Sequence, residues 1–250
     1  MAATASGKDK VQRYARLFVG GYDLSGSART VGSLDNNFGE VDITGWSESV
    51  KNFLADYRRV VGIRGFQAIV DDTAGKSFAV LKDAPNDHIV TMGLGGGGEP
   101  VVPDPAYLVY GLQLNDNTGW EGGAAIINAD FIPSQTNYNV SADNPWGHVL
   151  QGASSLSSTT TGSSHDNEAA SSNGFHAHLH VLATSSGNFA ITIEHSTNDS
   201  AWATLATFTS TAGAITAERQ VGTGTVNRYV RSVLTRTAGT ITVFIAYARN

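Results

Sequence analysis

The sequence contains no cysteine, which excludes disulfide bonds and thiolate metal sites. It also lacks any uninterrupted run of about 18 apolar residues, the length that predicts a transmembrane helix. The opening segment, MAATASGKDKVQRYAR, has no apolar stretch of the kind that a signal peptide requires. From these absences we expect a soluble protein that is synthesised in the cytoplasm and has no membrane partner.

Charged residues are scarce as well, at 15% of the sequence, and the formal net charge is −6. Nucleic-acid binding over a broad surface depends on clustered lysine and arginine, so this balance disfavours it. Glycine, serine and threonine are abundant instead, and β-branched residues outnumber strong helix formers in most windows. The composition therefore predicts a mainly β protein with many turns.

The motifs of common enzyme classes are also missing. Neither G-x-S-x-G nor H-E-x-x-H occurs in the sequence. Ala74-Gly75-Lys76-Ser77 is similar to the end of a phosphate-binding loop, but Val70 stands where that motif needs its first glycine. We therefore predict no catalytic residues, no metal ligands and no cofactor, and we expect that the protein is not an enzyme.

Two β-rich regions and a polar segment between them organise the chain. Residues 1–135 offer about seven strands and one helix, which predicts a β-sandwich or a partly closed barrel. Residues 136–172 are rich in serine, threonine and asparagine and predict a linker, with an apolar island at 146–150. Residues 173–250 carry alternating apolar segments at turn-bounded intervals, which predicts a second all-β sandwich.

Within the first region, residues 41–72 predict a strand, a corner, a short helix over 49–54 and a second strand. Val50, Phe53, Leu54 and Tyr57 have the i, i+3, i+4, i+7 spacing of one apolar helix face. The preceding segment SLDNNFG, residues 33–39, is expected to be a polar loop that exposes Phe38. That phenylalanine either folds back on its own domain or contacts a partner.

Downstream of these strands, a further short helical piece is expected over residues 78–81. In the C-terminal β-rich region, residues 173–250, His176, His178 and His180 alternate along one expected strand and therefore share a face. Such a face can bind a transition metal if a neighbouring strand supplies a further ligand, for which Glu194 and His195 are the candidates. We favour a half-exposed sheet face without a metal, and the spacing leaves the metal and a pH-sensitive packing face open.

One stretch carries a resemblance to a known family. The segment YARLFVGGYDLSG, residues 14–26, is followed by a long loop, an Asp-Ile-Thr strand end, the expected helix over 49–54 and a strand that ends in Asp71-Asp72. This order resembles the tail-tube (major tail) proteins of long-tailed phages and viruses. Trp46 and Arg58-Arg59 depart from the residue types that are commoner there.

The resemblance implies a virion structural protein of the tail, synthesised in the host cytoplasm. Six copies would form a ring, the rings would stack into a tube together with other tail proteins, and viral DNA would pass through without specific binding. The fold implied is a tail-tube-like β-sandwich or barrel with one short helix, followed by a second all-β sandwich. The candidate subunit contacts are Asn36, Asn37, Phe38, Trp46, Phe53 and Tyr57.

An alternative functional assignment gives a binding role to residues 173–250. A capsid decoration protein, or a baseplate or receptor-binding protein, would bind carbohydrate through the sandwich of residues 173–250. That region resembles the C-terminal β-modules that are often appended to phage tail and virion proteins.

Overall fold

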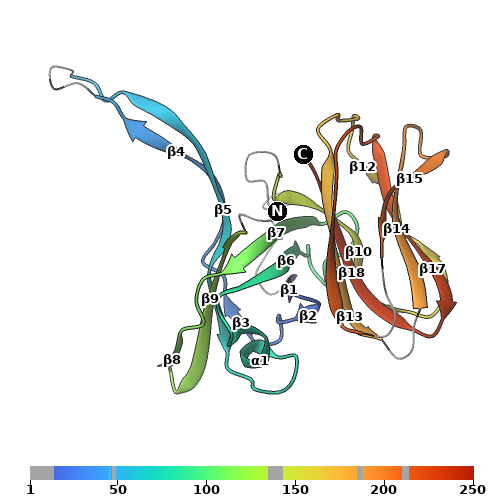
Figure 1. Ribbon diagram of the computed structural model, residues 1–250, viewed down its shortest axis with the longest axis horizontal. Coiled ribbons are helices and arrows are strands. Elements are labelled where there is room, and N and C mark those ends of the chain that lie inside the picture. Colours follow the sequence, from blue (N-terminus) through green and yellow to red (C-terminus); the bar gives the residue numbers. More distant parts are fainter. Residues whose placement is uncertain (1–13, 45, 47–48, 135–142, 185–187, 210–213) are drawn as a thin grey trace, which may run out of the picture.

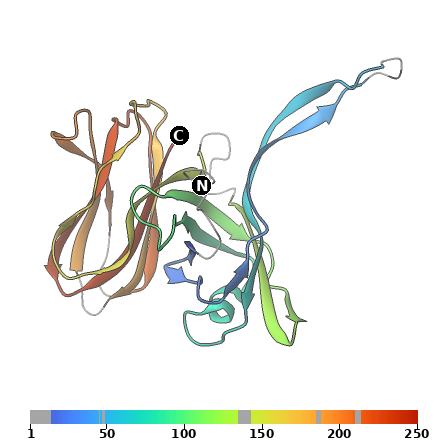
Figure 2. The same cartoon turned by 180° about the vertical axis from the view of Figure 1, so that it is seen from behind.

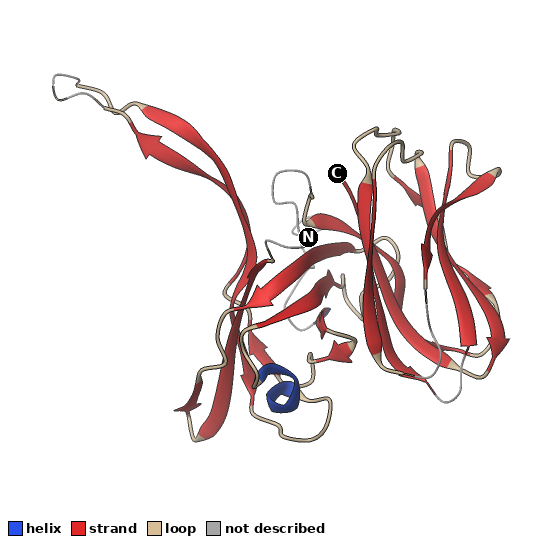
Figure 3. Cartoon of the chain, in the orientation of Figure 1, coloured by secondary structure: helices blue, strands red, loops and turns tan. Residues whose placement is uncertain are grey.

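The computed structural model describes residues 14–44, 46, 49–134, 143–184, 188–209 and 214–250, without the side chains of 39–41, 53–58 and 183–184. Within these ranges the chain is mostly β-structure, and the one helix is α1 (Ser77–Leu81) (Figure 3). The predicted mainly β fold with a short helix is confirmed, and α1 covers the helix expected over 78–81. No helix in the described part is long and apolar enough to cross a membrane.

The strands form two sheets. The larger sheet contains β1 (Ala15–Val19), β2 (Tyr22–Asp23), β3 (Ala28–Thr30), β4 (Ser33–Asp42), β5 (Phe53–Ile69), β6 (Asn86–Leu94), β7 (Pro105–Gln113), β8 (Thr118–Glu121), β9 (Ala124–Pro133), β10 (Trp146–Leu156), β13 (Phe175–Thr184), β16 (Thr216–Gly222) and β18 (Ile241–Arg249). The smaller sheet contains β11 (Thr160–Thr161), β12 (His165–Asp166), β14 (Asn188–Ser196), β15 (Trp202–Phe208) and β17 (Tyr229–Ala238).

Strand β7 is the branch point of the larger sheet. One of its edges pairs with β6, and the other pairs with β10 near Tyr107 and with β9 near Leu112. The sheet continues from β10 through β18 and β13 to β16. A single hydrogen-bonded sheet therefore runs through both β-rich regions of the chain (Figure 1).

The first unit, residues 14–134, is an incompletely closed barrel. Its strands follow the order β1, β6, β7, β9, β5, β3, and no pairing joins β1 to β3 among the described residues. The interior is an apolar core. Its largest fully buried members include Tyr107, Phe66, Phe131 and Ile63. The barrel therefore has an open seam between β1 and β3.

The C-terminal sandwich, residues 143–250, packs the β10, β18, β13 and β16 part of the larger sheet against the smaller sheet. Alternate residues of β13, β14, β17 and β18 form its core. β10 lies inside residues 136–172, the range for which the sequence predicts a linker. It is ordered there because β7 and β18 supply hydrogen-bonding partners on both sides, which its own composition does not reveal.

The two units also pack face to face. Phe18 of β1 stacks on Phe244 of β18 with ring centroids 4.3 Å apart, within a buried apolar cluster that includes Leu108 and Val149. At the turn between β1 and β2, Gly21 has a φ of +91°, and a Cβ there would lie 2.5 Å from the carbonyl oxygen of Thr216. Only glycine permits this close approach of the turn to β16.

The buried hydroxyl of Tyr107 connects β7 to β4 and β5. It accepts a hydrogen bond from the Gly62 N–H at 2.9 Å and donates to the carbonyl of Asp35. Substitution Tyr107→Phe is expected to lower the free energy of unfolding by about 1–3 kcal/mol, because a buried N–H loses its acceptor. Urea denaturation measures this loss, and Tyr110→Phe on the same strand is the matched control. Equal stability of Tyr107→Phe and the control would contradict it.

The helix expected over 49–54 is wrong. β5 begins at Phe53, and residues 33–42, of which 33–39 were expected to be a loop, form its partner β4. Residues 53 and 57 lie four apart, and that spacing puts two side chains on one face in a strand as well as in a helix. In an extended chain, positions 50 and 54 share one face and positions 53 and 57 share the other, so the apolar pattern does not exclude a strand. Pairing between the two segments decides for the strand.

Candidate functional site

The most distinctive feature of the molecule is the arm, residues 36–61 of the β4–β5 hairpin. It projects away from the body of the first unit in both views (Figures 1 and 2). Its two strands pair from Ser33↔Arg64 to Asp42↔Phe53. Among the described residues, no third strand pairs with β4 or with residues 53–61 of β5. Both edges of the ribbon therefore present unpaired backbone groups.

Large apolar side chains on the arm are exposed. Trp46 at the tip is fully exposed, and Phe38 retains 62% of its accessible surface. Ile43, Val50 and Val60 are exposed too. A two-stranded ribbon without a buried face is at best marginally stable in water. Exposed apolar side chains next to unpaired strand edges are typical of a surface that binds another protein.

All six residues predicted as subunit contacts lie on this arm. Asn36, Asn37 and Phe38 are opposite Val61, Val60 and Arg59, respectively. The guanidinium of Arg59 lies 6.0 Å from the centroid of the Phe38 ring. Trp46 is in the connection between the strands. Phe53 and Tyr57 are on β5, and their side chains lie outside the described part. The roles of all six residues as subunit contacts stay predictions.

The base of the arm is held by Arg59. Its Nε donates to Asn36 Oδ1 at 2.6 Å across the hairpin. Its Nη1 donates to the backbone carbonyl of Asp143 at 3.3 Å, and its Nη2 donates to Asn144 Oδ1 at 3.5 Å. Asp143 and Asn144 immediately precede β10. The arm is thus attached to the C-terminal sandwich by side-chain contacts as well as through the sheet.

Asp143 is also one partner of a buried ion pair. Its Oδ2 lies 2.6 Å from Arg219 Nη2 of β16, and the two side chains are only 5% and 10% exposed. Asn250 Nδ2 donates to the other carboxylate oxygen at 3.4 Å. Asn250 Oδ1 in turn accepts the backbone N–H of Asn144 at 3.1 Å. We call Arg59, Asp143, Asn144, Arg219 and Asn250 the polar hub.

The three alternating histidines lie beside this hub. His176, His178 and His180 share a face of β13 as predicted, but all three are fully buried, so the half-exposed face is wrong. The first unit covers that face: Thr91 of β6 contacts His178 and His180, and the ring of Phe18 lies 5.6 Å from that of His180. Local sequence does not show this cover because it comes from strands far away in the chain.

Hydrogen bonds fix the proton positions on two of these rings. The backbone N–H of Gly21 donates to His180 Nδ1 at 3.3 Å, so the ring proton of neutral His180 is on Nε2, which donates to Thr91 Oγ1 at 2.9 Å. The Thr91 hydroxyl then donates to His178 Nδ1 at 2.9 Å. A second proton on His180 would be on Nδ1, where its N–H would point at the N–H of Gly21, so two hydrogen-bond donors would face each other. This chain of hydrogen bonds, from the Gly21 N–H through His180 and Thr91 to His178, therefore requires neutral imidazole rings.

The pKa values of the histidines agree with this requirement. Burial lowers the pKa of His180 to about 3. Burial, followed by the nearby charge of Arg219, lowers the pKa of His176 to about 4. Burial, with the charge of His176 next, also lowers the pKa of His178 well below its ordinary value. All three rings are thus neutral at pH 7.

The candidate metal site does not assemble. Glu194 and His195 are on β14 of the smaller sheet, which packs on the other side of the sandwich from the histidine face. Glu194 instead pairs with Arg231 at 2.7 Å, and His195 Nδ1 accepts the N–H of Asn227 at 3.2 Å. Within the described ranges, no group of three or more histidine, aspartate or glutamate side chains is placed to hold a metal ion.

The sequence does not predict the polar hub. Arg59, Asp143, Arg219 and Asn250 are dispersed over nearly the whole chain, and none belongs to a motif. The only available signal was Arg58-Arg59, the pair that departs from the residue types commoner in the family that the sequence resembles.

Comparisons with solved structures give distant likenesses, two of which are described below. No family model matches the sequence, and no curated protein matches it. The Dit protein of phage SPP1, a paradigm of the hub adsorption apparatus in phages that infect Gram-positive bacteria, is 11% identical, with a TM-score of 0.35 over 94% of this chain and 99% of that one. A structure of infectious bursal disease virus, Gx strain, is also 11% identical, with a TM-score of 0.25 over 94% and 76%. Both TM-scores are low, so the function proposed below rests on the arm and on the sequence.

Proposed function

We propose that this protein is a structural subunit of the tail of a long-tailed virus, and that copies of it assemble into rings through the arm. The more specific role we propose is that of the tube subunit, whose stacked rings form the conduit for the genome. The observation that carries the proposal is the arm itself: a long ribbon with two unpaired edges and a fully exposed Trp46 at its tip. The order of elements that resembles tail-tube proteins supports it.

Two further properties support an assembly role. The net charge of −6 suits a conduit through which DNA passes without binding, because like charges repel. The arm is also joined to the rest of the chain by a continuous sheet and by the polar hub. The base of the arm is therefore held in place before assembly, which lowers the entropy that is lost when a partner binds.

The alternative in which the C-terminal sandwich binds carbohydrate finds less support. Sugars bind proteins largely by stacking on open aromatic faces. The guanidinium of Arg231 lies 3.9 Å from the ring centroid of Trp202, and that of Arg228 lies 5.0 Å from that of Tyr229. On these two rings of the smaller sheet, an arginine already occupies one face.

An arm-shortened variant tests the proposal. Phe38 and Arg59 are directly opposite each other, so replacing residues 39–58 by Asn-Gly closes a shorter hairpin with a favoured turn. We expect the complete protein to give rings or tubes of even bore by negative-stain electron microscopy, and the shortened variant to remain monomeric by analytical ultracentrifugation.

Trp120→Ala is the matched control, because Trp120 is another exposed tryptophan on a hairpin of the first unit. This variant should still assemble. Monomers of the complete protein over a wide concentration range would contradict the proposed function. Assembly of the shortened variant would show that the arm is not the contact.

A further inference from the structure

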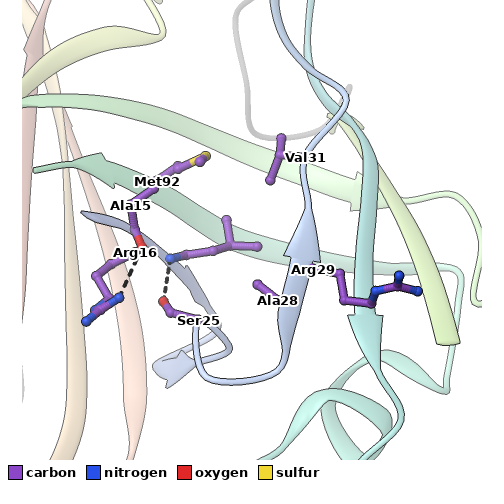
Figure 4. Close-up of a pocket in the computed structure, with 8 residues that line it drawn as sticks. Ala15, Arg16, Ser25, Ala28, Arg29, Val31 and Met92 are labelled. Atoms are coloured by element: carbon purple, nitrogen blue, oxygen red, sulfur yellow. Dashed lines mark hydrogen bonds between the residues drawn. The ribbon is translucent and has the colours of Figure 1, made fainter. Parts of the chain in front are cut away.

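The open seam of the first unit contains a cavity. It has a volume of about 340 Å³ and lies where the barrel lacks a strand between β1 and β3 (Figure 4). Its lining comes from β1, the β2–β3 connection, β3, the residue that follows β3, and β6: Ala15, Arg16, Leu17, Ser25, Ala28, Arg29, Val31 and Met92. The seam thus offers an apolar floor between two arginines.

The β1 edge of the seam pairs with β2 at Phe18 and Val19, whereas side chains and a turn cover it over residues 15–17. The Leu17 N–H donates to the Ser25 hydroxyl at 2.8 Å, and the Leu17 carbonyl accepts the Leu24 N–H at 3.0 Å. The Ala15 carbonyl accepts Arg16 Nη1 at 3.3 Å (Figure 4). An incoming strand can replace the serine and arginine contacts with backbone hydrogen bonds of the ordinary β type.

Positive charge borders the cavity, and its lining includes no carboxylate. Arg16 pairs with Glu99, and Arg29 lies 3.0 Å from Glu121. All four of these side chains are partly exposed to solvent. Such surface ion pairs contribute little, so exchanging them for carboxylates of a partner has a small cost.

We propose that this seam accepts residues 40–43, the end of β4 and the residue that follows it, from the arm of a second copy of this chain. The inference rests on the self-assembly proposed above and assigns its receptor surface. The segment reads Glu-Val-Asp-Ile, so acidic and apolar residues alternate. In a strand this alternation places the acidic residues on one face and the apolar residues on the other. The first face suits the arginines of the seam, and the second suits its apolar floor. Asp42 and Ile43 are both exposed, and the edge of β4 that faces away from β5 is unpaired in the described chain.

The arm of the same molecule cannot fill its own seam. β4 begins two residues after Val31 and extends for ten residues, so its distal end lies about 30 Å from the seam. Residues 1–13, which precede β1, carry Lys8, Lys10 and Arg13 against Asp9. Their net positive charge opposes that of Arg16 and Arg29. Charge complementarity therefore favours the acidic segment of a second copy.

Cross-linking tests the assignment, because the chain has no native cysteine. A Val31→Cys protein is mixed with an Ile43→Cys protein and oxidised mildly. We expect a disulfide-linked dimer of one copy of each, and none when Ile43→Cys is mixed with Ser200→Cys, whose cysteine is on the remote β14–β15 turn. A charge reversal in the Val31→Cys protein, Arg16→Glu with Arg29→Glu, should reduce the yield of this dimer at least tenfold. The opposite reversal in the Ile43→Cys protein, Glu40→Lys with Asp42→Lys, should restore the yield.

The outcomes separate this inference from the proposed function. Rings without the cross-link between positions 31 and 43 would overturn the seam as the receptor and leave the assembly role intact. Monomers without the cross-link would overturn both. If deletion of residues 1–13 from isolated Val31→Cys protein exposes its introduced thiol to a thiol reagent, the segment that fills the seam is the chain's own, and the assignment to a second copy fails.

Discussion

Substitution of Asp143 by alanine is expected to lower the free energy of unfolding by about 3–5 kcal/mol. The change removes the carboxylate that pairs with Arg219, whose guanidinium then stays buried without that opposite charge. It also removes an acceptor from Asn250. The free energy of unfolding from guanidinium chloride titration gives the magnitude.

Asp166→Ala is the matched control for this prediction. Asp166 and Arg228 have the same 2.6 Å separation as Asp143 and Arg219, but their side chains are largely exposed. Water solvates the arginine that remains, so the control should unfold almost like the unchanged protein. Similar losses in both variants would show that burial of the pair does not determine its contribution.

Acid is expected to produce the second large effect. The unfolded chain binds protons at its histidines below about pH 6.5, whereas the folded chain holds His176 and His180 neutral until about pH 4 and 3. The unfolded state therefore binds more protons over this window, and stability falls as the pH falls. Each of these histidines contributes a slope of about 1.4 kcal/mol per pH unit.

The groups around the histidine face add to this sensitivity. Arg219 and Arg59 repel a proton on His176, and Asp143 is the carboxylate that opposes them. Thr91 and the Gly21 N–H hold the neutral forms of His178 and His180. Thermal unfolding followed by circular dichroism between pH 7 and pH 4.5 should show the loss.

Two variants separate the buried histidines from other titrating groups. His180→Gln should reduce the slope by about 1.4 kcal/mol per pH unit, because glutamine cannot take up a proton there. His195→Gln should leave most of the pH dependence, because His195 is half-buried on β14 of the smaller sheet, away from the histidine face of β13. A melting temperature that stays constant between pH 7 and pH 5 would refute the prediction.

The sequence predicts the parts of this fold that depend on local pattern. The class, the helix over 78–81 and the shared face of His176, His178 and His180 are confirmed, because composition and period-two alternation are properties of short segments. It fails at residues 49–54, where residues four apart share a face in strand and helix alike. The division into residues 1–135, 136–172 and 173–250 stays a prediction, and β10 lies within the middle range.

The candidate site was foreseen only in outline. Asn36, Asn37, Phe38 and Trp46 were selected by resemblance, and they lie together on the arm. The arm is a ribbon with free edges because β4 pairs with β5 alone along it among the described residues. The alternation of apolar and polar residues in a sequence does not specify which segments pair. The burial of the histidines and the ion pair of Asp143 depend on contacts between distant strands, which a single sequence does not encode in any local signal.

The shared position of β7 has a mechanical consequence. Tension applied to the tip of the arm passes along β5 into β9, then into β7, and from there into β10 of the C-terminal sandwich. Each of these junctions is an antiparallel ladder of several backbone hydrogen bonds. A pull on the arm should therefore reach the C-terminal sandwich through paired strands rather than through a flexible linker.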